Sequence, residues 1–442
     1  MHGQRIAVVG GGVAGLGAAW LLSQHHEVTL IEANDYVGGH TNTLEVPGPD
    51  GEPMPVDTGF IVYNEPNYPL LSGLFQHLGV VTRASDMSFG FSSGDPDLEY
   101  AGDNLATLFG QRRNLVRPAF LGMVRDILRF NRAARTALTE GLDPRLSLED
   151  FLQRQRLGEA LRHHYLLPMA AAIWSCPQQQ MLEFPAAALL RFFHQHGLIQ
   201  LMGRPQWRTV CGGGRAYVRR MLPALARVAT GTPVRRVSRD GDGVRLLGDD
   251  GELGRFDAVV LAAHADQTLE MLEHPTSLQR TLLGAFRYQP NEAWLHTDPG
   301  AMPRRRRVWS SWNHMSTRAG NGSRPVSVTY WMNRLQSLPG ETPYLVSLNP
   351  LVPPRPERTL RRVVYQHPVF DHHALRAQAL LPRIQGRDRL WFCGSYFGYG
   401  FHEDALRSGA EVALALGAAL PWRAAQAQGG AEPRGELAPE AA

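Results

Sequence analysis

The first apolar run of the chain, IAVVGGGVAGLGAAWLL at residues 6–22, has no charged residue but contains five glycines. Each glycine weakens a helix by about 1 kcal/mol relative to alanine, so the run is a poor candidate for the core of a secretion signal. Only Arg5 precedes it as a basic residue, and no small-residue cleavage site follows. The pattern instead predicts a short buried strand at 6–9, a tight turn, and a helix that ends near Ser23.

The rest of the chain alternates between strand-like and helix-like patterns. Residues 28–33 complete a strand–helix–strand unit, and residues 104–200 are mostly helical by apolar spacing. Asp-Gly pairs within 233–263 predict hairpins, followed by a buried strand at 258–263. Further expected elements are a strand at 55–62, short strands at 293–297, 308–312, 326–331 and 344–348, turns and a helix at 359–386, a strand, glycine-rich loop and helix at 389–420, and a disordered tail at 423–442.

The glycines of the first turn have the spacing of a dinucleotide-binding motif. Gly10 permits the tight turn, Gly12 lets the backbone approach a pyrophosphate, and Gly15 lets the helix pack closely on the strand. The free N–H groups at the start of that helix, near Ala14, attract phosphate. Glu32, 22 residues after Gly10 and at the end of the second predicted strand, is placed to bind ribose hydroxyls. The combination predicts dinucleotide binding.

Composition narrows the class of protein. The chain has 442 residues, 43% of them apolar, which suits two or three globular domains. It contains no lysine, so all 45 basic residues are arginines, and the net charge of +4 does not indicate a nucleic-acid site. Cys176, Cys211 and Cys393 are too far apart for a disulfide framework or metal spacing, which favours a cytoplasmic protein without a metal site.

Several motifs together resemble FAD enzymes of the amine oxidase and phytoene desaturase superfamily. The residues that carry this resemblance, and that it implies contact the cofactor, are Gly38, Gly39 and His40 after Glu32; Asp57, Thr58 and Gly59 in VDTGF; Val234 in TPVRRV; and Gly394, Ser395, Phe401, His402 and Glu403 in the last loop and helix. The resemblance covers about residues 5 to 420 and implies FAD as the cofactor. Within the superfamily, the chain is similar to bacterial predicted NAD/FAD-binding proteins and to the oxidase-like N-terminal domain of plant cyclopropane fatty acid synthases.

The resemblance also implies a fold and its division. We expect an α/β protein with a discontinuous Rossmann-type FAD-binding domain and an inserted α+β substrate domain, as in flavin amine oxidases. The expected parts are 1–85, 206–275 and 376–422 for the FAD-binding domain, 86–205 for a helical substrate or cap domain, 276–375 for the substrate-domain sheet, and 423–442 for the tail.

Three departures from the family pattern change what is expected. Ser395 stands where relatives carry an acidic residue, which weakens the ribityl contact or shifts it to Glu403. The glycine-rich loop SYFGYG has no cysteine for flavin attachment, so FAD is expected to be non-covalent. The lysine that many amine oxidases hold near the flavin has no counterpart, which makes ordinary amine oxidation a weaker alternative.

The substrate side is less defined by sequence. Tyr396, Tyr399 and His402 are the candidate catalytic residues because their loop is expected to lie against the flavin, and His402 is a candidate proton relay. Ordinary helix capping or a contact with Glu403 is the other interpretation of His402. Further aromatic candidates for an apolar slot are Tyr63, Trp174, Tyr330 and Trp331.

Two features leave an association with membranes open. The apolar segments 165–173 and 184–199 suit a substrate cap or a membrane-resting face, and PRRRR at 303–307 suits a solvated turn or a dock for anionic headgroups or an acidic carrier protein. The expected location is cytoplasmic, with peripheral membrane contact as an option.

The sequence therefore favours an FAD-dependent oxidoreductase that moves a hydride between flavin and an apolar substrate, a fatty acyl chain or lipid. Desaturase, oxidase and double-bond isomerase activities all remain open. The alternatives are a flavin amine oxidase and a non-catalytic FAD-binding accessory protein of a lipid-modifying methyltransferase. No nucleic-acid partner is expected.

Overall fold

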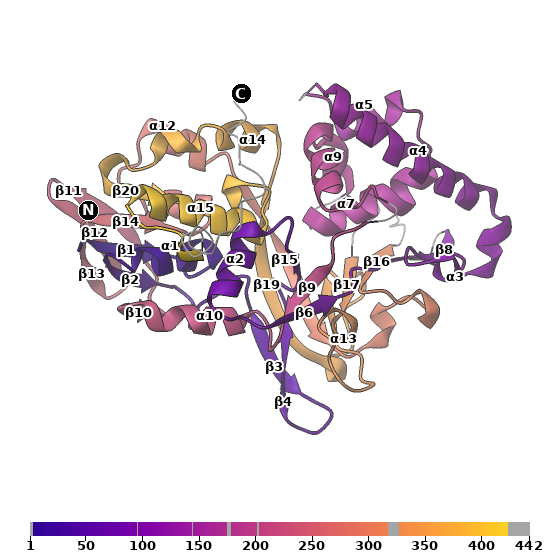
Figure 1. The fold of residues 1–442 in the computed structure, drawn as a ribbon, viewed down its shortest axis with the longest axis horizontal. Coiled ribbons are helices and arrows are strands. Elements are labelled where there is room, and N and C mark those ends of the chain that lie inside the picture. The colour runs from indigo at the N-terminus through magenta and orange to yellow at the C-terminus, as the bar shows by residue number, and fades with distance from the viewer. Residues whose placement is uncertain are drawn as a thin grey trace, which may run out of the picture.

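The structure is a computed structural model that describes residues 3–94, 96–143, 145–174, 178–200, 203–316 and 327–422. The predicted disordered tail and Cys176 lie outside these residues. Figure 1 shows two lobes side by side, one around a parallel sheet and the other around a mixed sheet capped by helices.

The first lobe is built on a parallel sheet whose strands come from distant parts of the chain. Its order is β10 (Arg227–Ala229), β2 (Glu27–Ile31), β1 (Arg5–Val9), β14 (Ala258–Leu261) and β20 (Leu390–Phe392). Ile6, Val8, Val259 and Val260 are fully buried, as expected for strands covered on both faces. The predicted strands at 6–9, 28–33 and 258–263 and the predicted Rossmann-type fold are confirmed.

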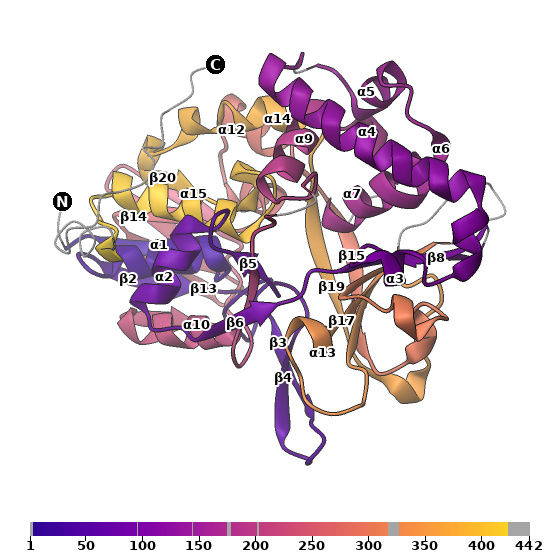
Figure 2. The same ribbon diagram turned by 45° about the vertical axis from the view of Figure 1, so that its right-hand side comes forward.

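Two helices pack tightly against each other beside this sheet. They are α1 (Val13–Leu22) and α15 (His402–Ala415), and both begin near the residues where the sequence predicts them. A Cβ atom on Gly409 would lie 2.1 Å from the carbonyl oxygen of Ala14, and one on Gly17 would lie 2.6 Å from Leu406. These glycines let the N-termini of α1 and α15 lie near the same space (Figures 1 and 2).

The hairpins predicted within 233–263 form an antiparallel meander next to the parallel sheet. Its strands are β11 (Arg236–Asp240), β12 (Gly243–Gly248) and β13 (Gly251–Phe256). The other small elements are β3 (Thr43–Pro47) paired with β4 (Pro53–Asp57), and β9 (Trp207–Val210) between β5 (Tyr63–Asn64) and β6 (Thr82–Ser85). The strand expected at 55–62 therefore ends at Asp57. Helices α2 (Pro69–His77), α10 (Arg215–Met221), α11 (Ala265–Met271), α12 (Ser277–Leu283) and α14 (His372–Gln378) complete this lobe.

The second lobe contains a long mixed sheet. Its order is β19 (Thr359–Val369), β15 (Arg287–His296), β18 (Leu345–Leu348), β17 (Ser327–Trp331), β16 (Trp312–Ser316), β7 (Phe89–Gly94) and β8 (Asp97–Ala101). The strands predicted at 326–331 and 344–348 are confirmed, and the one predicted at 293–297 is the end of a longer strand.

Two predictions in this lobe are wrong. Residues 306–308 form a 3-10 turn and the strand begins only at Trp312, because the Ser310 hydroxyl donates to the carbonyl of Val308 and the Ser310 N–H donates to Asn313 Oδ1, which holds this segment in a turn. Residues 359–369, predicted as turns, form β19, which pairs along the whole of β15. Strands β7 and β8, which the sequence analysis left out, extend the same sheet from within the segment expected to be helical.

Helices cover this sheet as a cap. They are α3 (Leu105–Leu108), α4 (Pro118–Glu140), α5 (Leu148–Arg154), α6 (Glu159–Leu161), α7 (Leu167–Trp174), α8 (Gln178–Glu183) and α9 (Ala186–Gln195), with α13 (Met332–Leu335) below the sheet in Figure 1. The apolar segments considered above as a membrane-resting face are core instead, because Leu167–Ala172 are all buried and Leu189, Leu190 and Phe193 of α9 are at most 1% exposed. In the described part of the chain, no helix is both long enough and apolar enough to cross a membrane.

Candidate active site

The glycine turn between β1 and α1 forms one end of a cavity. Gly10 has φ +108°, and a Cβ there would lie 2.8 Å from the carbonyl oxygen of Ala262. A Cβ on Gly15 would lie 2.0 Å from the carbonyl oxygen of Gly10, so both positions exclude a side chain. A Cβ on Gly12 would meet nothing within 4 Å, because this residue faces the open cavity. Within the motif, Gly10 and Gly15 are therefore needed for packing, whereas Gly12 leaves space for a ligand to approach.

The first turn of α1 presents free backbone N–H groups to this cavity. Gly12 caps the helix without a side-chain hydrogen bond, and the first turn holds no acidic residue. Val13 and Ala14 line the cavity beside it. Unpaired N–H groups together with the helix dipole make such a terminus an anion site, suited to a pyrophosphate.

The Gly38–Gly39 pair packs on this turn as the sequence predicts. The Gly38 N–H donates to the carbonyl of Gly11 at 2.9 Å, and Gly39 has φ +57° with its missing Cβ only 3.0 Å from the Cα of Gly12. Gly59 passes equally close to the carbonyl of His40, where a Cβ would lie 2.1 Å from the oxygen. These residues bring the loop after β2 and the loop after β4 to one end of the cavity.

Glu32 lies at the end of β2 and faces the same space. Its Oε2 accepts the Gly11 N–H at 2.6 Å, and its Oε1 accepts the Asn34 N–H at 2.8 Å. The carboxylate is 6% exposed and lines the cavity, as does Val234 nearby. A carboxylate has about four acceptor positions, so Glu32 is held in place and can still accept a ribose hydroxyl.

The cavity extends from this end to beneath the helical cap and has a volume of about 2110 Å³. Sites for one small ligand usually measure about 300–1,000 Å³, so the space admits a dinucleotide and a second molecule. The residues that line its far part are mostly apolar: Val124, Ile127, Met169, Ala172, Phe192, Leu198, Trp312 and Tyr330.

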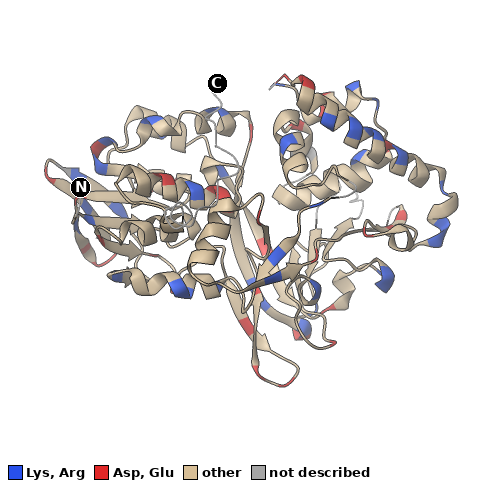
Figure 3. Ribbon diagram, in the orientation of Figure 1, with Lys and Arg blue, Asp and Glu red and all other residues tan. Residues whose placement is uncertain are grey.

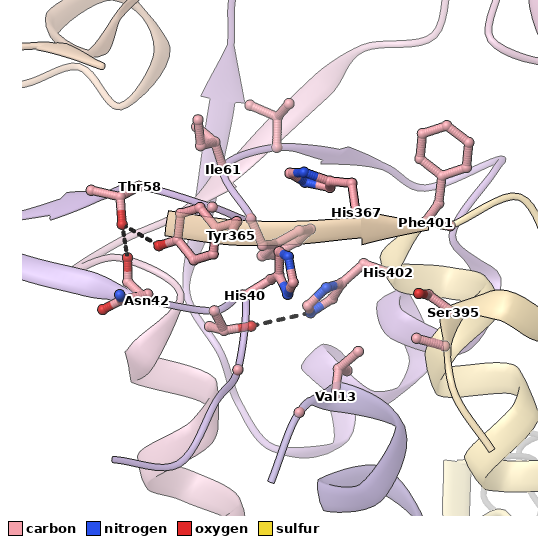
Figure 4. Close-up of a pocket in the computed structure, with 18 of the residues that line it drawn as sticks. Val13, His40, Asn42, Thr58, Ile61, Tyr365, His367, Ser395, Phe401 and His402 are labelled. Atoms are coloured by element: carbon pink, nitrogen blue, oxygen red, sulfur yellow. Dashed lines mark hydrogen bonds between the residues drawn. The ribbon is translucent and has the colours of Figure 1, made fainter. Parts of the chain in front are cut away.

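Histidine and tyrosine side chains lie where the two parts of the cavity meet (Figure 4). The histidine cluster consists of His40, His264, His367 and His402, all of which line the cavity. The His40 ring lies 5.2 Å from that of His367 and stacks on Tyr365 at 4.9 Å. Of the described residues, no three His, Cys, Asp or Glu side chains converge to hold a metal ion.

Burial keeps this histidine cluster uncharged. It lowers the pKa of His40 and His264 to about 4, and that of His367 and His402 to about 3. Neighbouring histidines lower each pKa further, because two positive rings would repel each other. At neutral pH the cluster therefore offers hydrogen-bond donors and acceptors without a charge.

The proton on His367 is placed by a chain of amides. The backbone N–H of Glu292 donates to Asn349 Oδ1 at 2.9 Å, which turns the Asn349 Nδ2 toward Asn291 Oδ1 at 2.6 Å. The Nδ2 of Asn291 must then donate to His367 Nδ1 at 2.8 Å. Because a neutral imidazole carries one proton, His367 bears it on Nε2 and presents a donor to the cavity.

His402 also lies in the cavity, with contacts that the sequence did not predict. Its Nε2 bonds the hydroxyl of Tyr217 at 2.8 Å, with Thr41 Oγ1 at 3.3 Å. Its ring stacks on Phe60 with centroids 3.9 Å apart. It therefore neither caps α15 through its side chain nor binds Glu403, and Asp404 accepts the N–H groups of Tyr399 and Phe401 instead.

Four residues expected at the site lie outside the cavity lining, and one of them, Gly15, packs against the carbonyl of Gly10 as described above. Glu403 accepts the N–H groups of Leu70 and Leu71 at 2.8 and 3.0 Å, so its carboxylate caps α2 rather than facing a ribityl chain. Burial raises its pKa to about 7. Asp57 is 1% exposed and accepts hydrogen bonds from Gly214 and Gln336, so it joins loops instead of touching a ligand. Tyr399 packs against the core of the helical cap.

The other predicted residues divide in the same way. The cavity lining includes Gly10, Gly12, Ala14, Glu32, Gly38, Gly39, His40, Thr58, Gly59, Val234, Gly394, Ser395, Tyr396, Phe401 and His402. Of the aromatic candidates, Tyr330 lines the cavity, whereas Tyr63, Trp174 and Trp331 do not. Trp331 packs edge-on against Trp309 instead, with ring centroids 5.5 Å apart.

The sequence analysis missed Tyr365, His367 and Asn291. All three lie on β15 and β19, and the sequence analysis expected turns rather than a strand where β19 lies. The available signal was the period-2 spacing of Val363, Tyr365 and His367, which places them on one face of a strand. Asn291 carried no signal, because its role depends on a partner 76 residues away.

Comparison with known proteins agrees with this geometry. Residues 13–416 match the family model described as flavin containing amine oxidoreductase, so the chain belongs to that family. This confirms the resemblance at the level of the superfamily. The family implies a flavin cofactor, and the residues at the glycine turn and at Glu32 fit it.

Individual relatives differ in what they act on. The carotenoid phi-ring synthase of Streptomyces griseus is 30% identical over 278 residues, which cover 58% of this chain and 52% of that protein. The chain thus spans about half the length of the curated relatives it matches. A fatty acid isomerase from P. acnes that produces CLA has the same fold, with a TM-score of 0.66 and 15% identity over 94% of this chain and 99% of its own. Putrescine oxidase bound to putrescine matches with a TM-score of 0.64 and 19% identity, covering 93% and 98%.

Proposed function

We propose that this protein is an FAD-dependent oxidoreductase that moves a hydride between a long apolar substrate, a fatty acyl chain or related lipid, and the flavin. The observation that carries the proposal is one continuous cavity. It has phosphate- and ribose-binding groups at one end and an apolar chamber of aliphatic and aromatic side chains at the other. Oxidation, desaturation and redox-neutral double-bond isomerisation all use this arrangement.

The cofactor contacts follow from the backbone at the first end. The N–H groups at the start of α1 would hold the pyrophosphate, Glu32 a ribose, and the backbone beside Val234 the adenine. The N-terminus of α15, at Phe401 and His402, would face the flavin ring. When bound, the flavin supplies the hydride acceptor or donor.

Non-covalent binding of FAD is supported by the state of Cys393, which precedes the last glycine-rich loop. Cys393 is fully buried and does not line the cavity, and burial raises the pKa of its thiol to about 12. A thiol without thiolate character is a poor nucleophile for attachment. Acid or heat precipitation should therefore release intact FAD into the supernatant, and yellow colour that stays on the pellet would contradict this part of the proposal.

The protein's own side chains would orient the substrate and keep the reacting end dry. Phe192, Tyr330 and Trp312 line the chamber and would surround an extended apolar substrate. Their apolar surfaces would exclude water from the bound substrate. His367 Nε2–H offers one fixed hydrogen-bond donor at the junction of the two parts of the cavity. A polar group on the substrate or the flavin would be held there.

Amine oxidation is the second candidate, and the family match favours it. The carboxylates that line the chamber are paired with arginine, so the chamber should attract a protonated amine only weakly. Asp86 and Asp103 both line the cavity, but each lies 3.0 Å from the guanidinium of Arg334. Arg334 offsets one of these two charges, and Arg204, which also lines the cavity, acts on Asp103, so little net negative charge is left to attract a cationic substrate.

The deciding experiment exposes the flavin-loaded protein to a panel of acyl lipids and simple amines without oxygen. Flavin bleaching by lipids, or a shifted double bond in the recovered fatty acid, is the expected result. Rapid bleaching by amines alone would establish amine oxidation instead. If neither class reacts and the protein co-purifies with a lipid methyltransferase, an accessory role replaces the proposed one.

A further inference from the structure

Helix α4 carries an exposed stripe in which leucine and arginine alternate. Leu121, Arg125, Leu128 and Arg132 are spaced by three or four residues, so they lie on one face of the helix. Large apolar side chains on this part of the surface are well exposed: Leu105 by 74%, Leu115 by 53%, Val116 by 80%, Leu121 by 43% and Leu128 by 51%. Leucines and valines exposed to water on adjacent turns indicate a surface that binds a membrane or another molecule.

The same segment is strongly basic. Residues 104–135 contain seven arginines and one acidic residue, a net charge of +6 against +4 for the whole chain. Figure 3 shows the basic positions along α4. Arg112 and Arg132 have no ion pair among the described residues, whereas Arg125 and Arg129 both pair with Asp126 and Arg113 pairs with Asp97. The charge suits an anionic surface.

The arginine run at 303–307 adds less to this surface than its composition indicates. The Arg305 guanidinium lies 2.6 Å from Glu99, a carboxylate with no exposure, and the Arg304 N–H donates to the same side chain at 2.8 Å. Arg306 lies over the ring of Trp309. Arg304 and Arg305 therefore anchor strand β8, while Arg304, Arg306 and Arg307 are exposed at a 3-10 turn, as a solvated turn predicts. A dock for anionic headgroups or an acidic carrier protein stays a prediction for this run.

The stripe borders the cavity. Val124, Ile127, Leu128 and Asn131 of α4 line the cavity, and Leu128 belongs to both surfaces. At 100° per residue, these side chains lie beside the Leu121–Arg132 face of the same helix. A molecule that leaves an apolar phase at the stripe would reach the chamber without crossing water.

We propose that the surface formed by Leu105, Leu115, Val116 and the α4 stripe docks on an anionic lipid bilayer. The exposed leucines and valines enter the boundary between headgroups and acyl chains, and the arginines pair with lipid phosphates. The side of the cavity that Leu128 lines then faces the membrane. This docking is independent of the reaction that the flavin carries out.

The test is co-sedimentation of the full-length flavin-loaded protein with vesicles. One set contains phosphatidylcholine with 30% phosphatidylglycerol as a test composition near biological anionic content, and the other contains phosphatidylcholine alone. Binding to the first set only, weakened by salt, is expected. The Arg125→Gln/Arg132→Gln pair should weaken binding by roughly 25-fold, since each arginine near the surface contributes about fivefold. Val116→Ser/Leu121→Ser should weaken it by about tenfold or more.

The matched control is Val352→Ser/Arg383→Gln, which changes an exposed valine and an exposed arginine elsewhere. It should bind as the unchanged protein does, and flavin content should stay normal in every variant. Equal binding to both vesicle sets, no binding to either, or equal binding by stripe and control variants would overturn the proposal. So would a dimer that the stripe variants dissociate, because the surface would then join two copies of the chain.

Discussion

The two ends of the cavity differ in the groups that line them: mainly backbone at one end and side chains at the other. At the dinucleotide end, the contacts come from backbone: N–H groups at the start of α1, glycines without a Cβ, and one carboxylate held by amides. At the substrate end, they come from side chains on strands and helices far apart in the sequence, such as Phe192, Tyr330 and His367. The first end depends on where side chains are absent, and the second on which ones are present.

This difference determines how each end tolerates change. A backbone site is specified by a short contiguous motif, and adding an atom to it blocks the ligand. A side-chain site can lose one member and keep its shape, so its substitutions are expected to act by degrees. The predictions below test that contrast, beginning with the largest effect.

Gly12→Val is expected to abolish flavin binding while the protein still folds. The added side chain enters open space in the empty cavity, where nothing lies within 4 Å, but it occupies the approach of the pyrophosphate. Flavin content should fall by more than about 100-fold, as judged by absorbance of the purified protein. Gly122→Val, which also adds a side chain with no atom within 4 Å, is the control and should stay yellow. A yellow Gly12→Val protein would refute the assignment of the turn.

The contrast also explains what could be predicted from sequence. Gly10, Gly12, Gly15 and Glu32 act within one strand–helix–strand unit, so spacing alone located them. The parallel sheet followed from continuous apolar strands, and the hairpins followed from Asp-Gly turns. These signals come from residues close together in the chain, so they can be recognised from the sequence alone.

The substrate end gave weaker signals because its contacts are long-range. Glu403 follows the family motif but caps α2, since Leu70 and Leu71, more than 330 residues away, bring N–H groups to it. Tyr399 lies two residues from a cavity residue, Phe401, yet faces the helical core. Neither outcome depends on the neighbouring sequence. It depends on which element packs alongside.

The second prediction concerns His367. His367→Phe keeps a ring of similar size but removes the Nε2–H donor, so the rate of flavin reduction by substrate should fall by about 100-fold with flavin content unchanged. An unaltered rate would show that the donor touches nothing that reacts.

Asn291→Asp tests the amide chain behind it. The new carboxylate would accept the proton of His367 Nδ1, which leaves Nε2 bare in the neutral ring and raises the lowered pKa. Activity should then rise as pH falls from 8 to 5, because protonation restores the Nε2–H. In the unchanged protein the pKa of His367 is about 3, so titration of this residue should not change the activity between pH 8 and pH 5. Asn104→Asp, at an exposed helix cap, should leave the profile as it was.

The third prediction concerns the length of the substrate. Each methylene buried in the chamber contributes about 0.8 kcal/mol, so apparent affinity should rise about fourfold per added carbon until the chamber is full. Tyr330→Ala, in the lining, should flatten this dependence, whereas Tyr399→Ala, outside it, should not. Affinities come from titration of the flavin spectrum with acyl lipids of increasing length. A dependence that both variants alter equally would place the substrate elsewhere.

The smallest expected effect concerns His314, which lies in β16 beneath the cap. The residue is fully buried and stacks on Phe91 at 5.6 Å, and neither ring nitrogen has a hydrogen-bond partner among the described residues. An unsatisfied buried polar group costs about 1–3 kcal/mol, so His314→Leu should raise the free energy of unfolding by about 1 kcal/mol at pH 8.

Burial lowers the pKa of His314 to about 3, below that of the unfolded chain. The unfolded state therefore binds a proton first as pH falls below about 6.5, and the native protein loses stability there. The gain from His314→Leu should grow by about 2 kcal/mol between pH 8 and pH 5. Denaturant unfolding at both values measures it, with the exposed His372→Leu as the control. A loss of stability in the leucine variant would contradict this prediction, because the stacking of the imidazole on Phe91 would then contribute more than its unsatisfied nitrogens cost.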